Sequence, residues 1–282
     1  MNQAMTTDML RELATEAGLD LVGAAPAGPS PTWDAYRAWL EAGYAGGMSY
    51  LAREDAVRRR EDPRHIMPEA RTVVMVAASY AGGPRPALPP LHGHVSRYAW
   101  GEDYHRWLLS RLKALVGAVE DRLGRRVNAR TYVDTGPVLE RAWAEAAGLG
   151  WTGKNTTLIH PRLGSYVFLG AALLDVALPP TPHPTMPTCG TCTRCIEACP
   201  TGAIVAPGRL DARRCLSYLT IEHRGPIPEP FRTAMGTRVF GCDTCQAVCP
   251  WNRRPAAEHA EEPAPDQATL YLPDLLTMDK ET

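Results

Sequence analysis

The sequence predicts an α+β fold with a mixed α/β N-terminal domain, a small cysteine-rich module and an acidic C-terminal tail, at residues 1–182, 183–255 and 256–282. Three observations support this prediction. Helical and strand patterns alternate along the first part of the chain, as they do in mixed α and β folds. All eight cysteines lie between Cys189 and Cys249. The proline-rich run Pro179–Pro184 separates the cysteine-free part from the cysteine-rich part, as expected of a linker.

The first half of the N-terminal domain contains three predicted helices and two predicted strands. Apolar residues at helical spacing predict helices over Met5–Ala17, Trp33–Glu41 and Ser49–Arg60. Continuous apolar runs predict strands over Leu21–Ala25 and Thr72–Tyr80, and the second run is rich in β-branched residues, which is typical of a buried strand. The proline- and glycine-rich segment Gly82–Gly93 is predicted to be a loop.

The second half of this domain continues the alternation. A long apolar stripe predicts a helix over Tyr104–Leu123. Another helix is expected after Asp134, with Pro137 in its first turn and Gly148 at its C-terminal end. Apolar runs predict strands over Arg130–Val133, Thr156–His160 and Ser165–Val176.

Composition excludes several classes of protein. The chain is 45% hydrophobic and 22% charged, which fits a globular protein with a core rather than a collagen, a coiled coil or a disordered chain. A net charge of −1 argues against a protein that binds nucleic acid over its whole surface. The N-terminus lacks the basic start and apolar run of a secretory signal, and no apolar stretch is long enough to span a membrane. We therefore expect a cytoplasmic protein.

The cysteines follow the spacing of bacterial iron–sulfur ferredoxins. Cys189 begins a C-x2-C-x2-C-x3-C-P run that ends at Pro200. A related group follows, although a long insertion separates its first cysteine from the rest. Eight thiolates can hold two [4Fe–4S] clusters, which predicts a ferredoxin-like module. The ferredoxin rule assigns to cluster 1 a first set, Cys189, Cys192, Cys195 and Cys249, and to cluster 2 a second set, Cys199, Cys215, Cys242 and Cys245.

Zinc and disulfide bonds are the alternative explanations of these cysteines. Structural zinc sites favour two separated C-x2-C pairs, which is a different pattern. Structural disulfides are rare in the cytoplasm. Both alternatives are therefore weaker than iron–sulfur binding.

Two further patterns are weaker than they look. Gly148–Gly153 matches G-x-G-x-x-G and, with Lys154, the start of a phosphate-binding loop. The match follows a predicted helix rather than a strand, and Asn155 stands where Ser or Thr is required. Lys154 and Asn155 could still line a pocket. Asp134 lies between a strand and a helix, where a turn or capping residue is expected.

Five strings of residues are similar to those of the epoxyqueuosine reductase family, the cobalamin-dependent enzymes of the last step of queuosine synthesis in tRNA. These strings are Val95–His105, Val133–Arg141, Glu145–Asn155, Asp211–Glu222 and Phe240–Asn252. Together with the cysteine pattern they extend from about Met48 to Arg254, and on this basis the chain is identified as a member of the family.

The resemblance implies an oxidoreductase that reduces the epoxide of epoxyqueuosine at the tRNA wobble position, giving queuosine. In this family two [4Fe–4S] clusters pass electrons to cobalamin, the reduced cobalt attacks the strained ring, and an aspartate gives a proton to the oxygen. Asp134 matches that aspartate. A carboxyl that acts as an acid near neutral pH needs a raised pKa, which burial beneath an apolar corrin supplies.

The resemblance also implies contacts with cobalamin. The expected residues lie in the matched strings and are Arg97, Asp134, Lys154, Asn155, Ser217, Gly241 and Cys242. Asp103-Tyr-His105 begins like the Asp-x-His-x-x-Gly loop of some cobalamin proteins, but Leu108 replaces its glycine. This departure fits a cofactor that is bound without a histidine under the cobalt.

One feature of the family is expected to be missing. Its members commonly carry a C-terminal helical-repeat domain, thought to help hold tRNA, and the acidic tail cannot form one. Binding of tRNA phosphates would then fall to arginines, the candidates being Arg53, Arg58, Arg59, Arg60 and Arg224. The expected partners are tRNA carrying epoxyqueuosine and an electron donor that the sequence does not identify, and we expect a monomer that does not associate with a membrane.

Two alternatives remain open. The first is a cobalamin-dependent reductive dehalogenase, a related chemistry with a similar cluster pattern. Those enzymes usually carry a twin-arginine export signal and favour a tyrosine as proton donor, and this sequence has no such signal. The second is a non-catalytic electron carrier of the ferredoxin type, for which the large cysteine-free part would be only a docking module.

Overall fold

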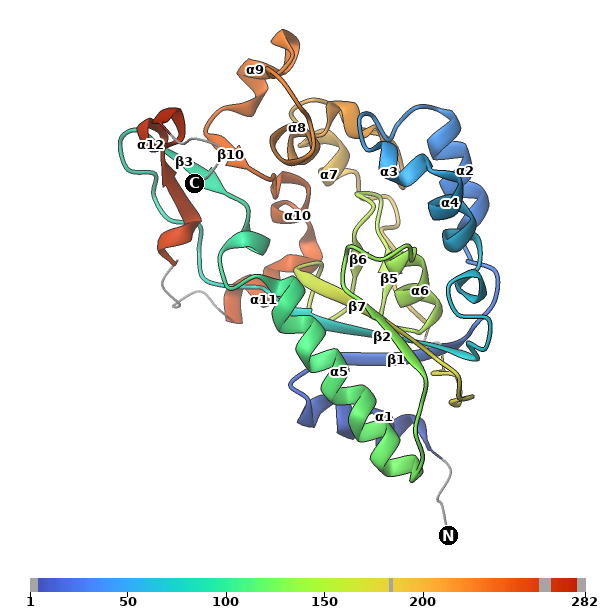
Figure 1. The fold of residues 1–282 in the computed structure, drawn as a ribbon. Coiled ribbons are helices and arrows are strands. Elements are labelled where there is room, and N and C mark those ends of the chain that lie inside the picture. The colour runs from blue at the N-terminus through green and yellow to red at the C-terminus, as the bar shows by residue number, and fades with distance from the viewer. Residues whose placement is uncertain (1–4, 183–184, 259–264, 278–282) are drawn as a thin grey trace.

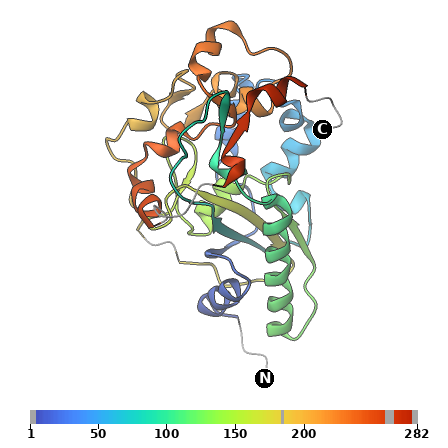
Figure 2. The same ribbon diagram turned by 90° about the vertical axis from the view of Figure 1, so that its left-hand side faces the viewer.

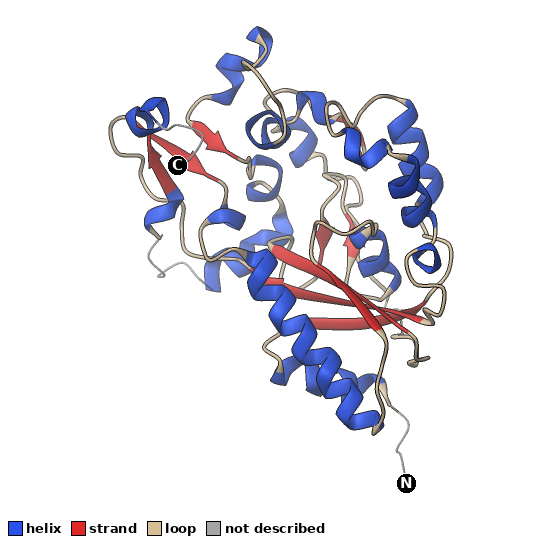
Figure 3. Cartoon of the chain, in the orientation of Figure 1, coloured by secondary structure: helices blue, strands red, loops and turns tan. Residues whose placement is uncertain are grey.

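A four-stranded antiparallel sheet forms the centre of the molecule in the computed structural model, which describes residues 5–182, 185–258 and 265–277 (Figure 1). The order of its strands is β1 (Leu21–Pro26), β2 (Thr72–Ser79), β7 (Val167–Leu174) and β4 (Ala129–Tyr132). Each neighbouring pair is antiparallel. Helices cover both faces of this sheet (Figure 3), which confirms the predicted α+β class.

Strand β2 is a continuous apolar run because both of its faces are buried. Every residue from Thr72 to Ala78 is buried, because successive side chains point into two different cores. Val74, Val76 and Ala78 enter the core under α1 and α5. The alternate residues enter the core under α6, and they are Val73, Met75 and Ala77.

One face of the sheet is covered by α1 (Thr7–Glu16) and α5 (Tyr104–Leu123). The buried residues of α5 recur every three or four positions, at Leu108, Leu112, Leu115 and Val119. Gly124, in the left-handed conformation with φ 62°, ends the helix. The predicted bounds of α5 are confirmed.

The other face of the sheet packs against α6 (Glu140–Ala146) and the hairpin formed by β5 (Trp151–Thr152) and β6 (Leu158–Ile159). The predicted start of α6 is wrong, because Pro137 lies in the preceding loop and Leu139 is the N-cap. The strand predicted over Thr156–His160 is shorter in the structure, where only β6 is a strand, because Thr156 has φ 67° and lies in the hairpin turn.

The helices α2 (Trp33–Glu41), α3 (Ser49–Ala52) and α4 (Glu54–Glu61) lie beyond α6, at the upper right of Figure 1. The sequence predicted one helix over Ser49–Arg60. Arg53 breaks it into two, because its backbone is extended, with ψ 140°.

The cysteine-rich module is built from short elements. These are α7 (Arg194–Glu197), β8 (Ile204–Ala206), β9 (Arg209–Leu210), α8 (Leu216–Ile221), α9 (Glu229–Met235), β10 (Arg238–Phe240), α10 (Thr244–Ala247) and α11 (Arg253–Glu258). Five 3-10 turns complete the described chain, at Pro63–His65, Arg97–Ala99, Ala212–Arg214, Pro250–Asn252 and Asp266–Ala268. None of the helices in the described part is long and apolar enough to cross a membrane.

A second sheet joins all three predicted segments of the chain. Its middle strand is β3 (His92–Val95), which pairs in parallel with β10 and antiparallel with β11 (Thr269–Tyr271). Figure 2 shows the C-terminal segment, including α12 (Leu272–Thr277), lying beside β3. Residues 183–184, where the module was predicted to begin, and tail residues 259–264 and 278–282 lie outside the described residues, and the domain limits stay predictions.

Buried polar residues tie the cysteine module to the central domain. Asn252 donates from Nδ2 to Ser165 Oγ at 2.9 Å and accepts from the Ser165 backbone N–H at 2.6 Å. Gln246 donates from Nε2 to the Ser165 carbonyl at 2.9 Å and to the Tyr80 hydroxyl at 3.1 Å. Because each bond joins buried groups from different segments, the module has a fixed position on the sheet.

Candidate functional site

The four cysteines of the first set line one cavity. Burial raises the pKa of Cys195, and so do the negative charges of the nearby Cys189 and Cys249 thiolates. Burial likewise raises the pKa of Cys249, with the Cys189 and Cys192 thiolates acting in the same direction. The structure therefore brings together the four residues that the spacing assigned to cluster 1.

The four cysteines of the second set also lie close to one another. Burial raises the pKa of Cys215, and the Cys242 and Cys199 thiolates raise it further. The pKa of Cys245 is raised by burial and by the charges of Cys215 and Cys242, and a further contribution comes from Cys195 of the first set. Cys245 is therefore the second-set cysteine on the side that faces the first set.

Backbone N–H groups favour the ionised form of several of these sulfurs, and at Cys199 they outweigh the effect of burial, which they do not at Cys215 and Cys249. Burial opposes ionisation of Cys199, but the N–H groups of Thr201 and Ala203 outweigh it and lower the pKa of this thiol. The Ala203 N–H donates to Cys199 Sγ at 3.2 Å. Cys215 immediately precedes α8, and Cys249 immediately precedes the 3-10 turn Pro250–Asn252. The first N–H groups of a helix or 3-10 turn have no acceptor within it, so they are available to these sulfurs.

The donor set fits iron–sulfur clusters. All eight cysteines are free thiols, and thiolates are the ligands that such clusters require. Within the described residues no three His, Cys, Asp or Glu side chains lie close enough to share one metal ion. A cubane carries its four thiolates on four different irons, so its ligands stand farther apart than those of a single ion.

The turn between β5 and β6 lies against the first set. Lys154 donates from Nζ to the carbonyls of Gly190 and Cys192 at 2.7 and 2.9 Å, and its backbone N–H lies 3.5 Å from Cys189 Sγ. Asn155 is buried, with 4% of its surface exposed, and lines the cavity of the first set. Both residues were predicted to contact cobalamin, and this stays a prediction; within the described residues Lys154 bonds to the cysteine loop and Asn155 lines the cavity beside it.

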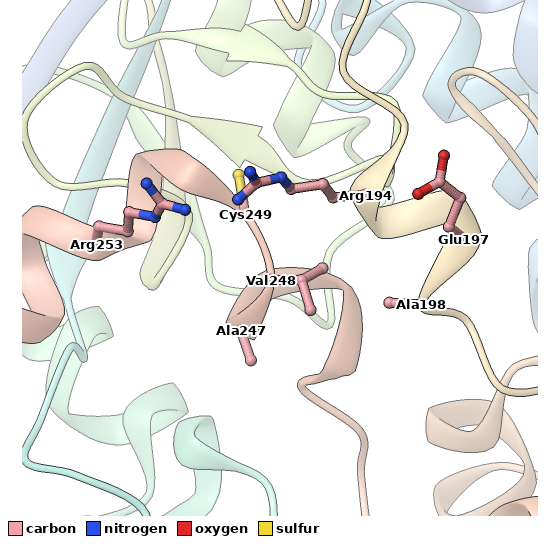
Figure 4. Close-up of a pocket in the computed structure, with 7 residues that line it drawn as sticks. All are labelled: Arg194, Glu197, Ala198, Ala247, Val248, Cys249 and Arg253. Atoms are coloured by element: carbon pink, nitrogen blue, oxygen red, sulfur yellow. The ribbon is translucent and has the colours of Figure 1, made fainter.

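An open pocket lies on the outer side of the first set (Figure 4). Its volume is about 500 Å³, and Arg194, Glu197, Ala198, Ala247, Val248, Cys249 and Arg253 line it. Figure 4 shows the guanidinium groups of Arg194 and Arg253 directed toward Cys249 from opposite sides. Neither arginine side chain has an ion pair or hydrogen bond within the described residues, whereas the neighbouring Arg254 pairs with Glu258 at 2.8 Å. The pocket therefore offers two arginines without ion pairs, together with the carboxylate of Glu197, beside a cysteine of the first set.

Asp134 lies in the loop between β4 and α6. Its backbone is left-handed, with φ 59°, which is uncommon for a residue other than glycine. The Glu140 carboxylate at the start of α6 accepts the Asp134 N–H at 2.8 Å and so holds this conformation. Asp134 was predicted to be a turn or capping residue: it lies in the bend between β4 and α6, but it does not cap α6, because this helix begins after Leu139 and its first acid reaches back to Asp134.

The Asp134 side chain points away from the core, with 61% of it exposed. His105 Nε2 lies 3.3 Å from its Oδ2, and His105 Nδ1 lies 2.8 Å from Asp103 Oδ1. Asp103 also accepts the His105 backbone N–H at 3.0 Å, and these bonds lower the pKa of Asp103. Asp103, His105 and Asp134 thus form one line of side chains.

Glu140 is the most perturbed carboxyl near Asp134. Burial raises its pKa to about 8, and the Asp134 charge acts in the same direction, whereas the hydrogen bond from Asp134 and the charges of Arg141 and Arg60 act against it. Neither Glu140 nor His105 was predicted from the sequence to belong to the site. The sequence signal for His105 is Asp103-x-His105, the start of a motif that fails at Leu108. The signal for Glu140 is only that it is an acid after a Pro-containing turn.

Tyrosines connect Asp134 to the second set. Burial raises the pKa of the Tyr104 hydroxyl, the nearby Asp134 charge raises it further, and the Tyr104 ring lies 6.3 Å from that of Tyr98. Burial raises the pKa of Tyr98 to about 12, with the Asp134 charge as the next cause. Gly241, with φ 72°, packs so closely that an added Cβ would lie 2.4 Å from Ser96 Cβ and 3.2 Å from the Tyr98 ring. Cys242 follows Gly241 directly. Tyr104, Tyr98 and Gly241 therefore form a wall of neighbouring residues between Asp134 and the second set.

The remaining predicted cobalamin residues lie around this wall. Arg97 donates to the carbonyls of Gly82 and Gly83 at 2.9 and 2.6 Å, and its guanidinium stacks over Trp100. Its backbone N–H bonds to Asp243, next to Cys242. Ser217 lies on α8, where Thr220 links its carbonyl to the Gly241 N–H. Arg97 of the N-terminal domain is thus bonded next to Cys242, and Ser217 is linked to Gly241, which precedes Cys242.

Among the arginines suggested for tRNA phosphates, Arg60 does not fit. It is buried, donates to the Ala56 carbonyl at 3.3 Å and lies over the Tyr36 ring. Arg53 and Arg59 each lie 3.5 Å from Asp55, and both pairs are exposed. Arg58 and Arg224 have neither an ion pair nor a side-chain hydrogen bond in the part of the chain that the structure describes.

Two family models match the chain. Residues 60–135 match "Epoxyqueuosine reductase QueG, DUF1730", and residues 188–252 match "4Fe-4S double cluster binding domain". The second match contains all eight cysteines.

Curated relatives resemble nearly the whole chain. The epoxyqueuosine reductase of Salmonella typhimurium is 42% identical over 273 residues, which are 95% of this chain and 70% of the relative. The Escherichia coli enzyme is 41% identical over 273 residues, covering 95% of this chain and 71% of the relative. The chain thus spans about 70% of the length of these proteins.

Solved structures share the fold. An epoxyqueuosine reductase crystallised with an epoxyqueuosine-modified tRNA-Tyr stem loop has a TM-score of 0.86 and 34% identity, over 97% of this chain and 73% of that chain. A Bacillus subtilis epoxyqueuosine reductase, captured with its catalytic aspartate loop swung out of the active site, has a TM-score of 0.83 and 34% identity, with the same coverage. The reductive dehalogenase NpRdhA reaches a TM-score of 0.56 at 16% identity over 89% of this chain and 32% of that chain, which shows a shared fold alone.

Proposed function

Because the chain belongs to the epoxyqueuosine reductase family, we propose that it reduces the epoxide of epoxyqueuosine in tRNA to queuosine. One observation carries this proposal: the same chain holds two sets of four free cysteines and the exposed carboxylate of Asp134. The chain therefore combines two cluster sites with a proton-donating group, which an electron carrier does not need. Its identity to epoxyqueuosine reductases favours this activity over dehalogenation.

The residues present fit the cofactors of this reaction. The first and second sets supply thiolates for two [4Fe–4S] clusters, with the assignment that the spacing predicts. Cobalamin, when bound, supplies a low-potential nucleophilic metal for opening the epoxide. Arg97, Ser217, Gly241 and Cys242 would hold it, because they lie in the strings that resemble the family and are linked to one another around Cys242 of the second set. The close packing of Gly241 against Ser96 leaves no room for a side chain at that position.

Asp134 is the proposed proton donor. Reduction of an epoxide places negative charge on its oxygen, so an acid must lie within hydrogen-bonding reach. The carboxyl is exposed in this structure, and a corrin and a nucleoside stacked over it would supply the burial that favours its protonated form. His105 bridges Asp134 and Asp103, and it is placed to return a proton to Asp134 after each turnover.

Electrons would enter at the first set and leave from the second. The open pocket of Arg194 and Arg253 reaches Cys249, whereas Cys242 of the second set lies next to Gly241 and the wall that leads to Asp134. The two arginines without ion pairs outnumber Glu197, the acid that also lines the pocket, and so complement an acidic surface. We therefore assign this pocket to the electron donor, a small redox protein with an acidic face.

The tRNA would bind on the side of Asp134. Arg58 and Arg224 are the candidates for phosphate contacts, since Arg53 and Arg59 are partly neutralised by Asp55 and Arg60 is buried. The monomeric state and the cytoplasmic location expected from the sequence stay predictions.

Turnover by the reconstituted protein tests the function. Protein loaded with both clusters and cobalamin should convert an epoxyqueuosine-containing tRNA stem loop to queuosine under strong reductant, as read by nucleoside mass spectrometry. Asp134→Asn should lower the rate by about 10²–10⁴-fold, the contribution typical of a general acid, while the cluster and cobalamin spectra persist. Failure of the wild-type protein to form product would exclude the activity, and full activity of Asp134→Asn would exclude the proposed acid.

A further inference from the structure

One buried amide group lacks a hydrogen-bond acceptor. Asn155 is 4% exposed, yet its Nδ2 has no partner among the described residues. A buried donor without an acceptor costs about 1–3 kcal/mol, so such a group in a native protein calls for a ligand. Asn155 lines the cavity of the first set, together with all four cysteines of that set. The unpartnered donor therefore belongs to the wall of a predicted cluster site.

The hydrogen bonds of Asn155 determine which end of its amide group is the oxygen and which is the nitrogen. Asn155 Oδ1 accepts from the Thr157 hydroxyl at 2.9 Å and from the Thr157 backbone N–H at 3.3 Å. An oxygen accepts both bonds, whereas an amide nitrogen could accept neither, so Oδ1 and Nδ2 cannot be exchanged. With Oδ1 held by Thr157, Nδ2 is left without a partner on the protein side.

The turn that carries Asn155 is itself fixed. Gly153 and Thr157 are joined by a backbone hydrogen bond of 2.9 Å, and Thr156 completes the turn with φ 67°. Lys154 anchors the turn to the cysteine loop through the carbonyls of Gly190 and Cys192. The amide thus reaches the cavity on a short turn that is bonded both to itself and to the cluster loop.

We propose that Asn155 Nδ2 donates an N–H···S hydrogen bond to the cluster held by the first set and thereby raises its reduction potential. This inference rests on the proposed iron–sulfur site. Reduction adds negative charge to the sulfurs, so a donor bonded to them stabilises the reduced form more than the oxidised form. The Lys154 ammonium, held at the same loop, acts in the same direction. Asn155 is a tuning residue of the cluster that receives electrons first, and it takes no part in opening the epoxide.

Redox titration of two variants tests the proposal. Asn155→Ala removes the donor, and Asn155→Asp keeps the oxygen that Thr157 binds but replaces the NH2 group by a second oxygen. Loss of one hydrogen bond of ordinary strength changes the ratio of reduced to oxidised cluster about tenfold, which is 59 mV for a one-electron couple. Electron paramagnetic resonance at controlled potentials should show the cluster 1 midpoint lowered by about that amount in Asn155→Ala, and by more in Asn155→Asp.

Two references make the result interpretable. The second cluster of the same molecules should keep its potential, because Asn155 does not line its site. Asn128→Ala is the matched control, since the Asn128 amide is bonded to Glu69 elsewhere on the surface. Iron content and cluster absorbance establish first that wild-type and variant proteins carry both clusters, and absence of clusters in the wild type would reject the proposed function instead. Unchanged cluster 1 potentials in loaded Asn155→Ala and Asn155→Asp would overturn the inference.

Discussion

The cysteine module and the Asp134 loop are neighbouring regions built on opposite plans. The cysteine module holds its sulfurs with backbone N–H groups, buried polar bonds and close packing, as at Cys199 and at Asn252. The Asp134 loop presents an exposed carboxylate on a left-handed residue, held by one side chain, Glu140. Electron-carrying groups need a fixed geometry before and after transfer, and the proton donor needs its final environment only when cofactor and substrate arrive. The protein therefore prepares the first region in advance and leaves the second to be completed by binding.

The largest expected effect comes from removing one thiolate of the second set. Cys245→Ala should lose one of the two clusters, about half of the bound iron, and abolish turnover, because the path from the first cluster is broken. Iron analysis and electron paramagnetic resonance give the readout. Cys195→Ala should remove the other cluster. If both variants lose the same spectral component, the assignment of cysteines to the two sets is wrong.

A smaller effect is expected from the line of side chains that leads to Asp134. His105→Gln keeps a polar group beside Asp134 but cannot transfer a proton as imidazole does, so product formation should fall by about 10- to 100-fold. Asp103→Asn, which leaves the imidazole in place and removes the charge that orients it, should cost less. The cobalamin and cluster spectra should stay those of the wild type. Rates for His105→Gln that equal the wild type would remove His105 from the mechanism.

Charge reversal at the outer pocket should affect only delivery of electrons. Arg253→Glu should raise the KM for an acidic redox protein about tenfold and weaken its dependence on salt, because an attractive contact becomes repulsive. Turnover with a small chemical reductant should be unchanged. The control is Arg254→Glu, whose native arginine is already paired with Glu258. Equal effects at the two positions would show that overall charge, rather than this pocket, matters.

The smallest effect concerns the stability of the loop region. The pKa of Glu140 is raised by burial to about 8 from an ordinary 4.5, so the folded protein keeps a proton that the unfolded chain has lost between these values. This contribution to stability is complete below about pH 4.5 and disappears as the pH rises through about 8. Glu140→Gln cannot ionise and should be more stable than the wild type above pH 8. A gain of about 1 kcal/mol corresponds to a Tm increase of about 2–4 °C. An identical pH dependence of Tm in both proteins would contradict the raised pKa.

Sequence patterns predicted best where one physical rule controls the local structure. The long helix α5 has its predicted bounds because its apolar stripe and Gly124 act together. The two cysteine sets gather as predicted because ligand spacing limits how short loops can close. Asp134 could be matched through resemblance, but neither its left-handed backbone nor its partners could, because both depend on Glu140 and on a helix that starts later than the pattern indicates.

Tertiary contacts account for the remaining differences. Lys154 and Asn155 looked like pocket residues from their glycine-rich context, and they do line a cavity, but beside the first set rather than beside Asp134. Only the fold brings the β5–β6 turn to a loop more than thirty residues later in the chain. His105 belongs to a motif that fails at Leu108, and nothing in the sequence indicates that its ring faces Asp134.

The second sheet sets the order in which the molecule can be completed during synthesis. β3 leaves the ribosome early, but both strands that flank it lie more than 140 residues later, at Arg238–Phe240 and Thr269–Tyr271. Until then both edges of β3 have no strand to pair with. Cys242 lies two residues after the end of β10, so the strand that closes one edge also brings a cysteine of the second set to its place. Docking of β10 and assembly of the second cluster are thus late events that we expect to depend on one another, and a growing chain that waits for iron would expose an edge prone to aggregation.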